Sequence, residues 1–304
     1  MYLAHFGLRE PPFSITPDTS FFFSHADHQA ALNTLLIAVR NGEGFIKITG
    51  EVGTGKTLLC RQFLASINRD AANGDARFVT AYIPNPYLEP RTLLLALAEE
   101  IGIELEQDAD QYHLLKSLTQ ALLDFARSGK RVVLCLDEAQ AMPLESLEAI
   151  RLLSNLETEK RKLLQIILFG QPELNHKLQQ DSIRQLNQRI MFHYHLGPLG
   201  REAVAFYLSH RLRVANYPGA RLFSPAAVRR LHAASGGIPR LLNILAHKSL
   251  MLAYGEGGHQ VEGRHVRAAA QDTEAARSRP WRRWAVAASL LAAAGAAWGW
   301  MNLR

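Results

Sequence analysis

The sequence predicts an α/β protein with a parallel sheet covered by helices on both faces, followed by a small helical domain. Short apolar runs alternate with longer helical patterns up to about residue 199, which is typical of a parallel sheet. Beyond that residue only helical patterns remain, separated by glycine-rich and proline-containing turns. A glycine-rich turn joins the first expected strand to the helix that follows it.

The expected elements follow in order from periodicity and from turn residues. Residues 1–23 are rich in Phe and Pro and predict an extended strap, because proline prevents a long helix there. Ser24 is expected to cap a helix that runs to about Arg40. Strands are expected at 45–49, 78–83, 131–136, 163–169 and 191–196. Helices are expected at 57–68, 90–101, 111–128, 143–157, 201–216, 225–235, 239–254 and 262–275.

Composition bounds the class of protein. Hydrophobic residues make up 48% of the 304 residues, enough for a packed core, and two cysteines favour a reducing compartment. The N-terminus lacks the pattern of a cleaved signal peptide. Half of the net charge of +6 comes from 272–304, so the body is nearly balanced. Nucleic acid is therefore not an expected partner, because phosphate contacts need a concentrated basic face.

A complete phosphate-binding loop occupies residues 50–57. The residues Gly50-Glu-Val-Gly-Thr-Gly-Lys-Thr57 fit G-x-x-x-x-G-K-[ST] between an expected strand and an expected helix. Glycines let backbone N–H groups point at the phosphates, and the helix N-terminus favours negative charge. Lys56 is expected at the β- and γ-phosphates of ATP, and the Thr57 hydroxyl at Mg²⁺. The expected nucleotide-binding set is Gly50, Glu51, Val52, Gly53, Thr54, Gly55, Lys56, Thr57 and Leu58.

Two acids follow a buried strand and complete the expected site. Asp137 and Glu138 come directly after the apolar run 132–136, at the carboxyl end where ligand crevices of α/β proteins lie. Asp137 is placed to hold Mg²⁺, and Glu138 to orient and activate the attacking water. This pair favours hydrolysis of ATP over binding alone.

Several segments together resemble one known family. They are Phe6-Gly-Leu with Pro12-Phe13, the loop at 50–57, Asp137-Glu-Ala-Gln140, Leu152-Leu-Ser-Asn-Leu-Glu-Thr158, Gly170-Gln-Pro-Glu-Leu174, Arg184-Gln-Leu-Asn-Gln-Arg189 and Gly237-Ile-Pro-Arg240. Over about residues 1–275 the chain resembles the general secretion pathway protein A family of AAA+ ATPases, most of all its MSHA (type IV) pilus biogenesis members of the MshM type. The resemblance implies an AAA+ fold: a five-stranded parallel core with a helical lid.

The resemblance also implies roles for further residues. Gln171 matches the polar sensor of the γ-phosphate, and Arg240 matches the second sensor arginine, which contacts nucleotide in its own subunit. Arg189 matches an arginine finger that reaches into the site of a neighbouring subunit, with Arg184 as the competing position. The chain is therefore expected to form a ring or another homo-oligomer. Phe21 to Phe23 could touch the adenine, although packing in the core is the preferred interpretation.

An uncharged stretch near the C-terminus predicts a membrane anchor. Residues 285–301 are apolar, and all four tryptophans flank this stretch. Four arginines precede it and one follows, so the positive-inside rule keeps the ATPase domain in the cytoplasm. The expected domains are an α/β domain at 1–198, a lid at 199–275, a basic segment at 276–283 and a single-pass transmembrane helix at 284–301 of the bacterial inner membrane.

The leading hypothesis is a membrane-tethered AAA+ ATPase that assists assembly or positioning of a type IV pilus or a type II secretion machine. Two alternatives remain open from the sequence. One is a DNA-binding AAA+ regulator of the transposition-helper type, against which the balanced charge of the body argues. The other is a nucleotide-gated scaffold with little hydrolysis, against which Glu138 argues.

Overall fold

The chain folds into two compact units in a computed structural model that describes residues 2–72, 77–104, 110–157 and 162–277. The larger, α/β unit comprises residues 15–214 together with 238–240. The smaller, helical unit comprises residues 2–14, 215–237 and 241–277 of the described chain. The division differs from the expected domains, because residues 2–14 group with the helical unit and the helix after the sheet groups with the α/β unit.

The α/β unit is built on five parallel strands, as predicted, and the structure gives their order as β2-β3-β4-β1-β5. The strands are β1 (Phe45–Gly50), β2 (Phe78–Ile83), β3 (Arg131–Leu136), β4 (Leu164–Gly170) and β5 (Phe192–Leu196). The first and fourth strands are buried along their whole length. Burial of successive residues, which point to opposite faces, shows that these strands are covered on both sides.

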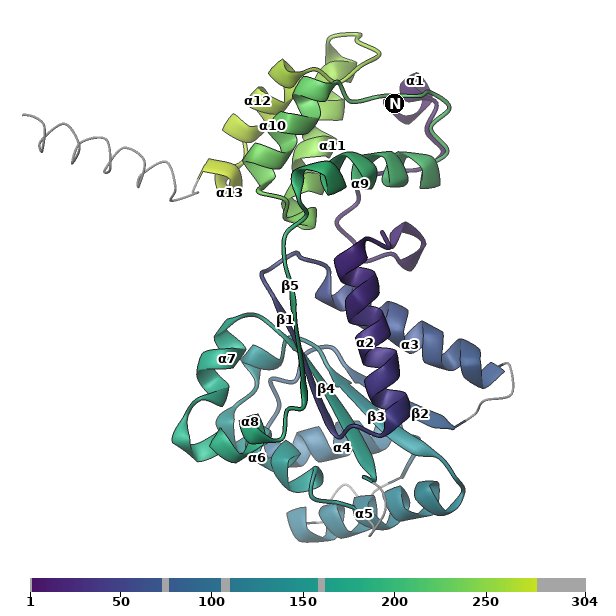
Figure 1. The fold of residues 1–304 in the computed structure, drawn as a ribbon, viewed down its shortest axis with the longest axis vertical. Coiled ribbons are helices and arrows are strands. Elements are labelled where there is room, and N and C mark those ends of the chain that lie inside the picture. Colours follow the sequence, from purple (N-terminus) through teal and green to yellow (C-terminus); the bar gives the residue numbers. More distant parts are fainter. Residues whose placement is uncertain (1, 73–76, 105–109, 158–161, 278–304) are drawn as a thin grey trace, which may run out of the picture. The chain divides into compact units, whose positions relative to one another are not determined.

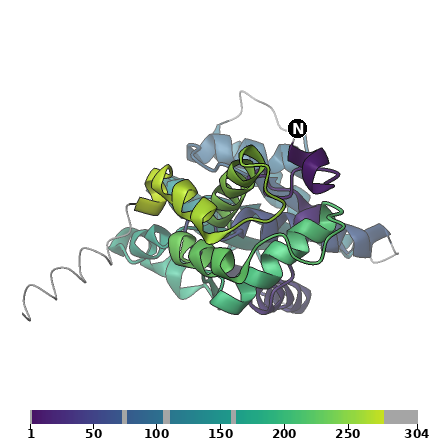
Figure 2. The same ribbon diagram turned by 90° about the horizontal axis from the view of Figure 1, so that it is seen from above.

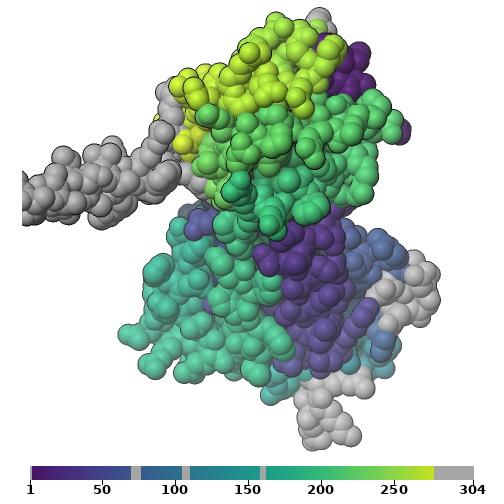
Figure 3. Space-filling model, turned by 45° about the horizontal axis from the view of Figure 1, so that its top comes forward, coloured from purple at the N-terminus to yellow at the C-terminus, as the bar shows by residue number. Residues whose placement is uncertain are grey.

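Helices cover the two faces of this sheet separately (Figure 1). Along β3, Val133 and Cys135 face α2 (Ala26–Asn41) and α3 (Lys56–Ala72), and the alternate residues face the other layer. That other layer contains α4 (Pro90–Glu100), α5 (Gln111–Arg127), α6 (Leu144–Leu153), α7 (Glu173–Leu178) and α8 (Arg184–Gln188). The helix α9 (Arg201–Val214) follows the last strand. In the space-filling view the surface of α2 lies beside the chain around β5, which it contacts (Figure 3).

Strand order fixes which loops meet. In the register of the sheet, Thr49 of β1 pairs with Gly170 of β4, and Leu136 of β3 pairs with Leu168 of β4. The carboxyl ends of β3, β4 and β1 are therefore neighbours, so the segments that begin at Asp137, Gln171 and Glu51 leave the sheet side by side.

The helical unit packs α10 (Pro225–Ser235) against α12 (Gly263–Gln271), with α11 (Pro239–Gly255) beside them (Figure 2). The N-terminal residues join it through α1 (Tyr2–Phe6) and backbone bonds, including Arg9 N–H to the carbonyl of Ala215 at 2.9 Å. His5 Nε2 lies 3.0 Å from the carbonyl oxygen of Gly258, and its ring stacks on His259. The expected strap at 1–23 is therefore divided: its first part packs with helices, and its second part belongs to the α/β unit.

Local chemistry explains several differences from the expected elements. The helix α2 begins at Ala26 with His25 as its N-cap, and the Ser24 hydroxyl donates to the side-chain oxygen of Gln29 instead of accepting from the N–H groups at the helix start. The helix expected at 143–157 ends at Leu153, and that expected at 262–275 ends at Gln271 before α13 (Glu274–Arg277). The short helices α7 and α8 were not expected.

No helix within the described residues is both long and apolar enough to cross a bilayer. The transmembrane helix predicted at 284–301 lies outside those residues.

Candidate nucleotide site

The loop between β1 and α3 has the backbone that its glycines permit. Gly53 and Gly55 lie at φ of +83° and +100°, where a side chain is strongly disfavoured. A Cβ on Gly53 would lie 2.5 Å from Cβ of Arg240, and one on Gly50 would lie 2.8 Å from the carbonyl oxygen of Leu196. The Thr54 hydroxyl closes the turn by donating to the carbonyl of Glu51 at 2.9 Å. Space for backbone approach is thus built into this cradle, as phosphate binding needs.

Lys56 is the first residue of α3, and its side chain turns back onto the phosphate loop. Its Nζ donates to the carbonyl oxygens of Gly50 at 2.8 Å and Glu51 at 3.1 Å. The side chain is 5% exposed, and burial lowers the pKa of Lys56, while the charges of Glu138 and Asp137 act in the opposite direction. A nearly buried ammonium bonded only to carbonyls in this loop is suited to exchange them for phosphate oxygens.

Thr57 and Asp137 meet across the site. The Thr57 hydroxyl donates to Oδ2 of Asp137 at 2.6 Å, and the Tyr82 hydroxyl lies 3.5 Å from the same oxygen. Burial raises the pKa of Asp137, and burial together with Asp137 raises the pKa of Tyr82 to about 12. A hydroxyl and a carboxylate at this spacing are hard oxygen ligands of the type that Mg²⁺ prefers. These residues therefore fit the predicted metal.

Glu138 follows in an uncommon backbone conformation. Its φ of +53° lies in the left-handed region, which costs about 1 kcal/mol or more for a residue with a side chain. The side-chain amide of Gln171, at the end of β4, donates to Oε2 of Glu138 at 3.3 Å. The structure thus brings the predicted water-activating acid and the predicted sensor together.

A pocket lies against the phosphate loop and the start of α3, where Thr54, Gly55 and Leu58 line it. Its wall is largely aromatic and includes Phe21, Phe22, Phe23, His28, Leu199, Tyr207, Arg211 and Pro239. His28 Nε2 donates to the carbonyl of Thr54 at 3.0 Å, which joins the pocket wall to the phosphate loop. The guanidinium of Arg211 lies 4.5 Å from the centre of the Phe21 ring. Such a wall suits a flat heteroaromatic base.

The remaining predicted residues lie at the periphery. Glu51 and Val52 are exposed at the tip of the loop. The backbone N–H of Arg240 donates to the carbonyl of Gly53 at 3.2 Å, and its residue is exposed. Residue 240 therefore lies at the phosphate loop, as the resemblance implies.

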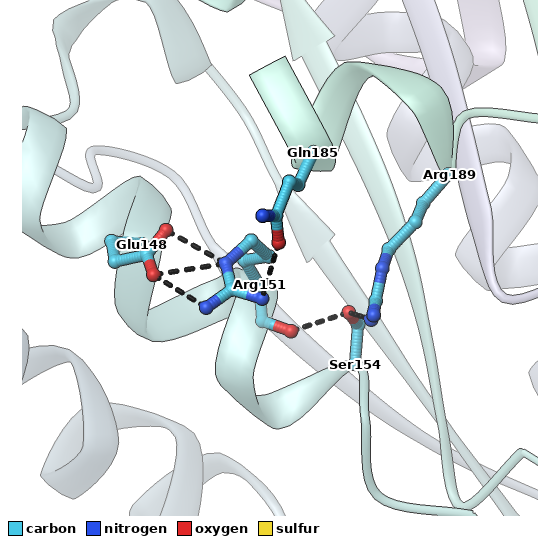
Figure 4. A network of polar contacts seen from close by, with 5 residues as sticks. All are labelled: Glu148, Arg151, Ser154, Gln185 and Arg189. Carbon is cyan, nitrogen blue, oxygen red and sulfur yellow. Dashed lines mark hydrogen bonds and ion pairs between the residues drawn. The ribbon is translucent and has the colours of Figure 1, made fainter. Parts of the chain in front are cut away.

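The two candidate finger arginines differ in their surroundings. Arg189 Nη1 donates to the Ser154 hydroxyl at 2.7 Å, and that hydroxyl donates to the carbonyl of Arg151 at 2.6 Å (Figure 4). The Arg151 guanidinium in turn donates hydrogen bonds to the side chains of Glu148 and Gln185 (Figure 4). Arg184 is exposed, and its side chain forms no hydrogen bond or ion pair with any described residue, while its backbone N–H donates to the carbonyl of Asp181. Neither arginine contacts the phosphate loop of its own chain within the described residues.

Comparison with known proteins agrees with this site. Residues 39–178 match the family model described as an AAA domain. The α/β unit has the AAA+ fold. Solved structures of the same fold include Cdc6p from Pyrobaculum aerophilum, with a TM-score of 0.63 and 16% identity over 84% of this chain and 70% of that one. Another is RuvB from Thermotoga maritima, with a TM-score of 0.55 and 14% identity over 85% of this chain and 73% of that one.

Among curated proteins the chain is similar to general secretion pathway protein A of Aeromonas hydrophila. The two are 40% identical over 99% of this chain. The chain spans 54% of the length of that relative, so the similarity covers about half of it.

Sequence reasoning missed three side chains that the structure places at the site: Tyr82, His28 and Gln140. Only Gln140 has a signal in the sequence, since it stands in the tetrapeptide 137–140 with the two acids.

The cradle geometry predicts the effect of one methyl group. We expect Gly53→Ala to weaken ATP binding by about tenfold or more, because the added Cβ meets Arg240 and the backbone at φ of +83° is strained. Gly129→Ala is the matched control, since Gly129 has φ of +76° but nothing within 4 Å of an added Cβ. Titration with a fluorescent ATP analogue measures both, and equal affinities would contradict the role of the cradle.

Proposed function

We propose that this chain is an ATPase that binds ATP with Mg²⁺ at this loop and hydrolyses it. The observation that carries the proposal is the convergence of Lys56, the Thr57–Asp137 pair and Glu138 at the carboxyl ends of β1 and β3, the two strands that flank β4. The match of 39–178 to an AAA domain supports it.

Each residue has a chemical task in this proposal. Lys56 exchanges its carbonyl partners for β- and γ-phosphate oxygens, and the loop N–H groups bind the same anion. Thr57 and Asp137 hold Mg²⁺, which when bound neutralises charge on the phosphates. Glu138 accepts a proton from the attacking water, and Gln171 holds that carboxylate from the end of β4.

The aromatic pocket is the proposed binding place for the adenine base of ATP. Phe21 to Phe23 and His28 line it beside the phosphate loop, so the adenine of ATP would stack there, and this becomes the preferred role of the three phenylalanines. Arg240 would contact phosphate, since its backbone already bonds to Gly53.

The active form in this proposal is a homo-oligomer. An arginine of one chain, Arg189 or Arg184, would reach the γ-phosphate in the next chain and offset the charge of the transition state. Exposure favours Arg184, whereas Arg189 must first leave Ser154.

The cellular role rests on similarity. The relative's name, general secretion pathway protein A, supports a role in a secretion machine, and the resemblance to MshM-type proteins supports assembly or positioning of a type IV pilus. The tryptophans and arginines around 285–301 support a tether to the inner membrane with the ATPase domain in the cytoplasm.

Hydrolysis is tested by removing the proton acceptor. We expect Glu138→Gln to keep ATP affinity and to lower Mg²⁺-dependent phosphate release by about 100-fold or more. Glu145→Gln is the control, because Glu145 is exposed at the start of α6. Tight ATP binding without phosphate release by the unaltered chain would instead indicate a nucleotide-gated scaffold.

Mixing two inactive variants of the chain tests which arginine, Arg189 or Arg184, is the arginine finger. A protein with Arg189→Ala or Arg184→Ala is mixed with an equal amount of Glu138→Gln protein, and phosphate release is measured. A finger variant keeps its own Glu138 and can borrow an arginine from the other chain, so we expect the mixture to exceed the sum of its parts. Rescue of only one arginine variant assigns the finger, and rescue of neither argues against a shared site.

The tether is tested by flotation of the full chain with lipid vesicles. We expect the unaltered protein to float, and Leu290→Arg with Leu291→Arg to remain at the bottom, because each charge costs about 3 kcal/mol at the centre of a bilayer. Ile37→Arg on the exposed side of α2 is the control and should float. An unaltered protein that stays at the bottom would contradict the tether.

A further inference from the structure

Two side-chain amides hold one oxygen of Glu138. Gln140 Nε2 donates to Oε2 at 2.5 Å, and Gln171 Nε2 donates to the same oxygen at 3.3 Å. No described residue donates a hydrogen bond to Oε1. The carboxylate therefore has one oxygen fixed by the protein and one left to accept from another group.

Gln140 is itself held at both ends. Its side-chain Oε1 accepts from the backbone N–H of Gln171 at 2.9 Å. Its backbone carbonyl accepts from Lys177 Nζ at 2.7 Å, and the same ammonium donates to the carbonyl of Met142 at 2.6 Å. Gln140 thus bridges the turn after β3 to the end of β4, and its amide has a single orientation in which Nε2 faces Glu138.

The backbone at Glu138 makes such support necessary. A residue at φ of +53° persists only where its surroundings determine it. A general base must also present a lone pair at hydrogen-bond distance from the water, and small misplacement lowers the rate steeply. The short bond from Gln140 meets both requirements.

We propose that Gln140 is a positioning residue for Glu138: it fixes Oε2 so that Oε1 is the oxygen that accepts the proton from water, and it ties this carboxylate to Gln171. The proposal rests on hydrolysis at this site. It gives the glutamine of the tetrapeptide 137–140 a task distinct from metal binding and from proton transfer.

The test is Gln140→Glu, which keeps an oxygen for the N–H of Gln171 but replaces the donor to Glu138 by a second carboxylate oxygen. We expect ATP affinity to stay within about threefold and kcat at pH 7 to fall about tenfold or more. The loss should appear in kcat and not in ATP affinity, because a carboxylate at position 140 cannot donate a hydrogen bond to Oε2 of Glu138.

A matched control exists on α5. Gln120 is exposed and its Nε2 donates to Asp124 at 3.2 Å, so Gln120→Glu makes the same chemical change far from the loop in sequence and on the outer helix layer. It should leave kcat and ATP affinity unchanged. A Gln140→Ala change added to Glu138→Gln should have no further effect on the residual rate, because Gln140 acts only through Glu138.

A readout without turnover separates this proposal from hydrolysis itself. The full chain, labelled with ¹³C at its glutamate side-chain carboxyls, is studied by NMR at one fixed pH, and Glu138→Gln assigns the Glu138 signal. In Gln140→Glu the chemical shift of that signal should change, because the hydrogen bond to Oε2 is lost, and in Gln120→Glu it should not. If the unaltered chain binds ATP without hydrolysing it, this spectrum still decides the contact. An unchanged chemical shift, an unchanged kcat in Gln140→Glu or a faster Gln140→Ala protein would overturn the proposal.

Discussion

Burial of β4 and β1 along their whole length, on both faces of the sheet, is the constraint on which the site depends. Strands buried in this way cannot shift in register without exposing apolar side chains and breaking the ladder. Their carboxyl ends are therefore fixed next to each other and next to β3. Groups from three distant parts of the sequence, the phosphate loop, the acids after β3 and Gln171, are held together by packing that takes no part in the chemistry.

The same burial puts charge where it is costly. Lys56 and Asp137 are 5% and 2% exposed. This burial lowers the pKa of Lys56 and raises the pKa of Asp137, so it favours the neutral form of each. Carbonyl oxygens and the nearby acids offset the cost of burying the charge of Lys56. The Thr57 hydroxyl offsets the cost for Asp137. A bound phosphate would replace the carbonyl partners of Lys56, and a bound metal would replace the hydrogen bond between Thr57 and Asp137. Two buried charges that are only partly compensated therefore lie at one place.

Much of the α/β unit could be predicted, because it follows from local patterns. The runs at 78–83 and 131–136 are apolar and bounded by turns, and the loop at 50–57 has glycines wherever the backbone needs them. The helices α7 and α8 are too short to show a period. Grouping of residues 2–14 with the helical unit depends on contacts such as Arg9 to Ala215, about 200 residues apart, which no local pattern encodes. Within the site, the roles of Thr57 and Asp137 follow from type and spacing, whereas the orientation of Gln140 depends on Lys177 and on the end of β4.

The bond between Arg189 and Ser154 has a consequence for the timing of assembly. Ser154 is the C-cap of α6, and its hydroxyl already donates to the carbonyl of Arg151. The bond from Arg189 to this hydroxyl contributes about 1 kcal/mol, and that amount is lost when the guanidinium turns away without a new acceptor. A half-buried Arg189 is therefore held to its own chain, and a second copy that was to bind it would have to offer an acceptor at least as good as Ser154.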